Sequence, residues 1–178
     1  TFDSLDYVFL ENEPKKSQNY WKLLGIYNGS RTYRWIDKKY MDARYPLSNN
    51  LEKFKVFVPK ANGSGAIGEV LSTPLIGNPF VSATPTFISI GAFDTEMEAK
   101  NLMKYIKSKF SRALLSILKI TQDNPPLKWA HIPLQDFTPN SDIDWSKSIP
   151  EIDQQLYKKY GLDKSEIDFI ETKIKAME

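Results

Sequence analysis

The chain has 178 residues, of which 41% are hydrophobic and 26% charged, and it contains no cysteine. These values are typical of one globular domain and exclude a disordered or fibrous chain. They also exclude disulfides and thiolate metal sites, and we expect a cytoplasmic protein. No apolar run approaches the roughly 18 residues of a membrane span, and residues 1–10 lack the basic start and apolar core of a signal peptide.

The formal net charge of +2 hides an asymmetry along the chain. Residues 1–122 carry a net charge of +6, and residues 123–178 carry −4. A basic first part suits an anionic partner, whereas an acidic second part suits packing against protein. Charges scattered over a solvated surface are the alternative interpretation.

The first predicted elements are strands. Residues 20–27 and 31–37 are aromatic and β-branched runs around Asn28-Gly29, the dipeptide that most strongly indicates a β-hairpin. Residues 38–50 predict a short helix or turn that leads into a loop. Residues 54–59 and 87–93 predict two more strands, joined by a long loop that glycine and proline punctuate.

The clearest predicted element is a helix over residues 94–122. Asp94 and Thr95 are good N-cap residues. One apolar stripe follows at helical spacing; it comprises Ala99, Leu102, Met103, Ile106, Phe110, Ala113, Leu114 and Ile117. A strand over 129–134 and helices over 150–160 and 164–177 complete the chain.

These elements predict an α+β fold in a single domain, residues 1–178. Its strand-rich part, residues 1–93, holds mainly antiparallel strands, with one long amphipathic helix packed on them. Its helical part, residues 94–178, ends in a helical C-terminus.

Gly63-x-Gly65-x-x-Gly68 matches the dinucleotide-binding fingerprint by letter. The fingerprint works only when its glycine turn opens a helix whose N-terminus binds the pyrophosphate. Here Pro74 follows before a helix can be established. A glycine loop that lays backbone N–H groups against a phosphate or a base edge is one alternative, and an ordinary surface loop is the other.

Asn124-Pro125-Pro126-Leu127 is similar to the Asn-Pro-Pro-aromatic motif of adenine methyltransferases, in which the aromatic ring stacks on the flipped base. Leu127 stands where the ring belongs. The motif also follows a predicted helix instead of a strand, and no glycine motif for S-adenosylmethionine precedes it. Prolines that end the helix are therefore the favoured interpretation.

Two acid-x-Lys triplets, at Asp37/Lys39 and Glu171/Lys173, match the skeleton of metal-dependent nucleases. Such sites need another acid on an adjacent strand, so that paired carboxylates hold the metal. Asp37 ends a predicted strand and is the better of the two candidates. His131 is the only histidine, and a packed or hydrogen-bonded side chain is a simpler interpretation than a zinc ligand.

A basic surface with interleaved aromatic residues remains, centred on the predicted hairpin. Alternation places Arg31, Tyr33 and Trp35 on one face and Arg34 on the other. Arg and Lys suit phosphates and base edges, and rings pack or stack. The alternative is an aromatic core with solvated cations. The candidate contact residues are Arg31, Arg34, Lys38, Lys39, Lys60, Asn62 and Ser64.

Residues 55–73, 93–122 and 133–160 together carry a family resemblance. Its most specific parts are Lys109-Phe110-x-Arg112 and Asp142-Ile143-Asp144-Trp145. The chain resembles the C-terminal region of adenine-specific DNA methyltransferases and of single-chain restriction-modification enzymes, over nearly all of residues 20–178. The resemblance implies recognition of double-stranded DNA by this region.

The resemblance also implies that chemistry belongs to the catalytic domains of the parent chain. S-adenosylmethionine, and magnesium where the parent cleaves DNA, are the cofactors expected there. For this chain itself we expect no catalytic residues and no membrane partner. A nuclease domain that uses Asp37, and a protein-interaction module that never touches DNA, are the alternatives.

Overall fold

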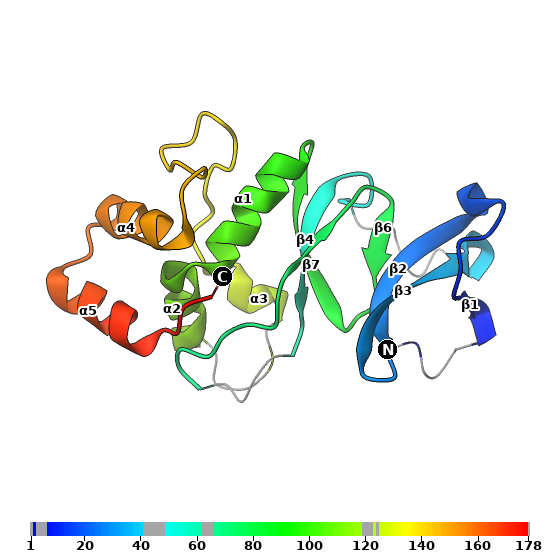
Figure 1. Cartoon of the computed structure of the whole chain (residues 1–178), viewed down its shortest axis with the longest axis horizontal. Helices are drawn as coiled ribbons and strands as arrows, with labels where there is room; N and C mark the ends of the chain where they lie inside the picture. The colour runs from blue at the N-terminus through cyan, green and yellow to red at the C-terminus, as the bar shows by residue number, and fades with distance from the viewer. Residues whose placement is uncertain are drawn as a thin grey trace.

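The computed structural model describes residues 2, 7–40, 49–61, 66–118, 123 and 125–177 (Figure 1). The strands are β1 (Phe9–Leu10), β2 (Tyr20–Tyr27), β3 (Ser30–Asp37), β4 (Phe54–Pro59), β5 (Leu75–Gly77), β6 (Val81–Ala83) and β7 (Phe87–Phe93). The helices are α1 (Glu96–Lys107), α2 (Lys109–Leu118), α3 (Pro126–Trp129), α4 (Ile149–Tyr160) and α5 (Lys164–Lys173), with short 3-10 turns η2 (Ser17–Asn19) and η3 (Lys38–Tyr40). The predicted α+β class, with strands first and helices last, is confirmed. Within the described residues, no helix is both long and apolar enough to span a bilayer.

The predicted hairpin forms the centre of the first sheet, which has the strand order β1-β3-β2-β6. Asn28 and Gly29 both have positive φ, 48° and 74°, as the tight turn of a hairpin requires. The strands β2 and β3 pair antiparallel over their whole length. Strand β6 adds to β2 in parallel, with Val81 beside Lys22.

The second sheet, β5-β4-β7, is antiparallel and lies between the first sheet and the helices (Figure 1). Val56 and Val58 of β4 are fully buried in the main core, which the helices share. Phe57, on the opposite face of β4, packs with Leu24 of β2 and Phe87 of β7. Strand alternation thus buries both faces of this sheet. The short β5 and β6 lie within the segment predicted as a long loop.

The prediction of one continuous helix over 94–122 is wrong, because the helix breaks at Ser108. The backbone there has ψ of 148°, which separates α1 from α2. The Ser108 hydroxyl donates to the Tyr105 carbonyl and accepts from the Ser111 N–H. The start of the helix is as predicted, with Thr95 as N-cap in a capping box. The end predicted at 119–122 lies outside the described residues.

A side chain from α4 caps the N-terminus of α2. The buried carboxylate of Asp153 accepts the backbone N–H of Lys109 at 3.1 Å and that of Phe110 at 2.9 Å. These N–H groups have no partner within their own helix. The side chain therefore satisfies them and also places an acidic group at the positive end of the helix dipole.

The Lys109-Phe110-x-Arg112 motif has a structural role in this arrangement. The Arg112 guanidinium is 1% exposed and donates to the carbonyls of Lys107 and Lys175. The Phe110 ring stacks on Tyr160 at 4.8 Å between centroids. The motif therefore joins α2 to α4 and to the residues after α5.

The predicted strand over 129–134 is wrong. Pro125 is extended and Pro126 occupies the first position of α3, where proline fixes a helical φ and needs no hydrogen-bonded N–H. The prolines therefore begin a helix here, and turns follow it. The two C-terminal helices are confirmed, although α5 ends at Lys173 because Ile174 is extended.

Candidate functional site

One face of the hairpin carries a lysine held over two aromatic rings. The register places Lys22 of β2 opposite Trp35 of β3. Its Nζ lies 5.4 Å from the Trp35 ring centroid and 5.2 Å from that of Tyr33. The attraction between an ammonium group and ring faces fixes this cation at the surface. The predicted division of faces is confirmed, since Arg34 lies opposite Leu23 on the other side of the hairpin.

The residues at the end of β3 repeat this arrangement. Lys38 Nζ lies 4.2 Å from the Trp21 ring centroid, and Lys39 Nζ lies 5.0 Å from that of Tyr40. Asp37 Oδ1 accepts the Lys39 backbone N–H at 2.9 Å and so shapes the turn. This bond, with the Lys39 ammonium 3.4 Å away, lowers the pKa of Asp37. The carboxylate thus remains ionised and forms an ion pair with Lys39.

An open hollow of about 550 Å³ lies beside these cations, and we call it the hairpin-end hollow. Aromatic and basic side chains from separate segments line it, with a few polar groups at the edge. The lining residues are Ser17, Gln18, Tyr20, Trp21, Lys22, Trp35, Lys38, Asn78, Pro79, Phe80 and Val81. The parallel pairing of β6 with β2 brings the last four beside the hairpin.

Phe80 occupies an unusual backbone conformation in this hollow. The Val81 N–H donates to the Asn78 carbonyl at 3.2 Å and closes a turn. Phe80 stands in that turn with φ of 62°, a region that favours glycine, and its side chain is 54% exposed. Phe80 is not among the residues predicted from the sequence, and its local sign is an aromatic residue at a position where a turn after Pro79 favours glycine.

Arg31 and Arg34 are less available than the sequence suggests. Arg31 is partly buried, donates to the Thr73 carbonyl and lies 5.8 Å from the Phe87 ring centroid. Arg34 is 2% exposed; its guanidinium lies 3.8 Å from the Tyr27 ring centroid and bonds Glu11 at 3.0 Å. We therefore remove Arg34 from the residues that can contact DNA.

The remaining candidates lie apart from the hairpin. Lys60 is exposed directly after β4, where its backbone N–H bonds the Thr86 carbonyl. Asn62 and Ser64 lie outside the described residues. Gly68, the last glycine of the fingerprint, packs against the backbone of Lys173, and residues 66–74 contain no helix. The dinucleotide interpretation therefore lacks its required helix in this described stretch.

Neither nuclease-like triplet belongs to a metal-binding group of acids within the described residues. Throughout the part of the chain that the structure describes, no three acidic or histidine side chains gather into a group that could hold a metal ion. Glu171 accepts from Tyr157 at 2.9 Å and pairs with Lys109. His131 is exposed and therefore not packed in the core, and a hydrogen-bonded side chain stays a prediction.

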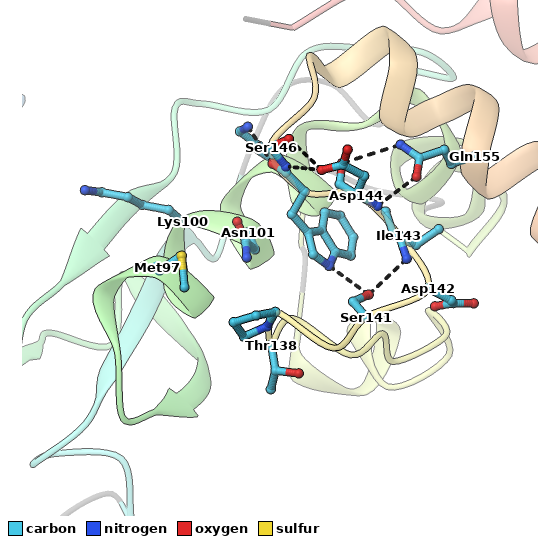
Figure 2. A pocket seen from close by; sticks show the side chains of 13 residues that line it. Met97, Lys100, Asn101, Thr138, Ser141, Asp142, Ile143, Asp144, Ser146 and Gln155 are labelled. Carbon is cyan, nitrogen blue, oxygen red and sulfur yellow. Dashed lines mark hydrogen bonds between the residues drawn. The ribbon is translucent and has the colours of Figure 1, made fainter.

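A second hollow, of about 680 Å³, lies between α1 and residues 138–146 (Figure 2). Its polar groups are already engaged within the fold. Asn101 donates to the Phe137 carbonyl at 2.9 Å, and Lys104 donates to the Trp145 carbonyl at 2.7 Å. The Trp145 indole N–H bonds Ser141 Oγ at 3.1 Å. The Asp-Ile-Asp-Trp motif thus anchors this loop to α1.

No family model, curated protein or solved structure matches the chain. Of these two hollows, the hairpin-end hollow is the one in which lysines lie over rings, Lys22 over Trp35 and Lys38 over Trp21. Such a surface is suited to binding phosphates and flat aromatic groups.

Proposed function

We propose that this chain is a DNA-recognition module of a restriction-modification enzyme, which docks double-stranded DNA for catalytic domains elsewhere in the parent chain. The observation that carries the proposal is the set of ammonium groups seated over rings at one end of the hairpin, those of Lys22, Lys38 and Lys39. The ring contacts restrict these long side chains before DNA arrives. Less side-chain entropy is then lost on binding.

The distribution of charge supports the same proposal. The net charge of +6 in residues 1–122 draws the hairpin end toward the DNA backbone. Phosphate contacts position the module, and side chains at the edge of the hollow are within reach of base edges. Methylation with S-adenosylmethionine, and cleavage with magnesium, belong in this proposal to the catalytic domains.

Fluorescence anisotropy with a labelled duplex at several salt concentrations tests the proposal. We compare the triple variant Lys22→Gln, Lys38→Gln, Lys39→Gln with a control that loses the same charge from the helices. The control substitutes the exposed Lys158, Lys164 and Lys173 with Gln.

We expect duplex affinity to fall steeply with salt. The slope of log K against log salt should become shallower by about 0.9 for each phosphate contact that a substitution removes. The control should keep the wild-type slope. Equal losses in both triple variants, or no duplex binding at low salt, would overturn the proposal. Plasmid cleavage in magnesium that Asp37→Ala abolishes would favour the nuclease alternative instead.

A further inference from the structure

The hairpin-end hollow has the shape of a stacking site, not only of a phosphate-binding surface. Aromatic residues from three segments line it, among them Trp21 of β2, Trp35 of β3 and Phe80 of the turn before β6. In a regular duplex the faces of each base are covered by its neighbours, and only the edges are open. Ring faces can engage a base only after it has left the stack.

The conformation of Phe80 points in the same direction. Glycine adopts φ of 62° without steric cost, whereas a bulky residue rarely occupies this region. The ring gains little burial in return, because 54% of the side chain is exposed. Strained residues of this kind cluster at ligand-binding sites.

Two of the residues that line the hollow are cations. Lys22 and Lys38 both line the hollow and lie over the rings of Trp35 and Trp21. The side-chain amides of Gln18 and Asn78 also line it and can both donate to and accept from a base edge. A flat ring, a polar edge and an adjacent phosphate are together the chemistry of one nucleotide.

We propose that the hairpin-end hollow holds one unpaired nucleobase of a DNA strand, stacked on Phe80, with its phosphate beside Lys22 and Lys38. This inference rests on the proposed DNA-binding function and adds the conformation of the DNA that is bound. A duplex distorted so that one base leaves the stack is the preferred ligand.

Anisotropy with two labelled probes of the same sequence tests this inference. One probe is a fully paired duplex, and the other carries a single unpaired thymine in the middle. Three variants separate the effect of the ring from that of the backbone conformation. Phe80→Gly removes both the ring and the steric conflict. Phe80→Leu keeps an apolar side chain without a ring, and Phe80→Tyr keeps the ring. Thermal unfolding of each variant checks that it is folded, and Phe80→Gly should unfold at or above the wild-type temperature.

We expect the wild type to bind the bulged probe about tenfold more tightly than the paired one, the size of one base–ring stacking contact. Phe80→Tyr should keep this preference. Phe80→Gly and Phe80→Leu should lose this preference and bind the two probes equally. Equal binding of both probes by the wild type, or a preference that survives Phe80→Gly, overturns the inference and leaves the proposed function standing. Binding of neither probe at low salt overturns both.

Discussion

Removing the Asp153 carboxylate should be among the most damaging single changes to the helical part. Its two oxygens accept the N–H groups of Lys109 and Phe110, and its side chain is buried. In Asp153→Ala both donors lose their partner at the break between α1 and α2. A buried donor without a partner costs about 1–3 kcal/mol. Burial of the ionised acid opposes folding at neutral pH and offsets part of this cost. We therefore expect the substitution to lower the free energy of unfolding by about 2–4 kcal/mol.

The pH dependence of this loss gives a second, sharper test. Burial raises the pKa of Asp153 from its ordinary 3.8 to about 6, against the opposing effect of the two N–H groups. The folded state therefore binds the proton more tightly than the unfolded state. The contribution of this group is fully present below pH 3.8 and falls as pH rises through about 6. The shift corresponds to about 3 kcal/mol.

Urea unfolding of the wild type and Asp153→Ala, followed by circular dichroism at pH 4 and pH 7, measures both quantities. The difference in unfolding free energy between the two proteins should be larger at pH 4 than at pH 7. Titration of the other acids affects both proteins alike and cancels from this difference. A gap below about 1 kcal/mol at pH 7 with an unchanged m-value would refute the capping argument. A gap that narrows toward pH 4 would show that the folded pKa lies below 3.8.

Four further substitutions test other contacts by urea unfolding. In Gly68→Ala, with φ of 82°, the new Cβ would lie 1.8 Å from the Lys173 carbonyl oxygen, so we expect a loss above about 3 kcal/mol. Gly29→Ala has φ of 74° but open space, and should cost about 1 kcal/mol. Arg34→Met should lower stability by about 1–3 kcal/mol yet leave duplex affinity unchanged; weaker DNA binding by the folded variant would contradict its assignment to the interior. Trp145→Phe removes a buried indole donor and should cost about 1–3 kcal/mol; a neutral effect would mean that this donor does not anchor its loop.

The hairpin was predictable because its determinants are local. Asn28 and Gly29 fix the turn, and alternation then assigns each side chain to a face. Alternation does not say which face is covered. Arg34 is buried because Phe2 and Glu11, from an earlier segment, lie on its side of the hairpin.

The break at Ser108 was not predictable from the apolar stripe. Ala99 and Ile106 of α1 bury against the same core as Phe110 and Ala113 of α2, so the stripe continues through the break. Ser108 is a reasonable N-cap, but the carboxylate that completes the cap comes from a distant helix. The structure of residues 125–134 was not predictable either. Pro125 and Pro126 are a local sign of a helix start, but the apolar run WAHIPL at 129–134 resembles a strand more than the turns that follow α3.

The candidate site shows the same limit. Lys38 and Lys39 were predicted because they belong to a basic stretch with interleaved aromatic residues, and both lie over rings. Phe80 was missed because a three-residue strand, β6, brings it to the hairpin. Parallel pairing of so short a strand leaves no pattern in the sequence.

The contact between Gly68 and the residues after α5 constrains the order of folding. The Lys175 N–H bonds the Gly68 carbonyl, and the Arg112 guanidinium bonds the Lys175 carbonyl. During synthesis Gly68 and Arg112 leave the ribosome long before Lys175. Part of the core that β4 and α1 share therefore stays open until the residues after α5 have been made. Contacts between such distant positions slow folding and expose apolar surface in the meantime. The strand-rich and helical parts therefore complete their native packing together, once Lys175 has been synthesised.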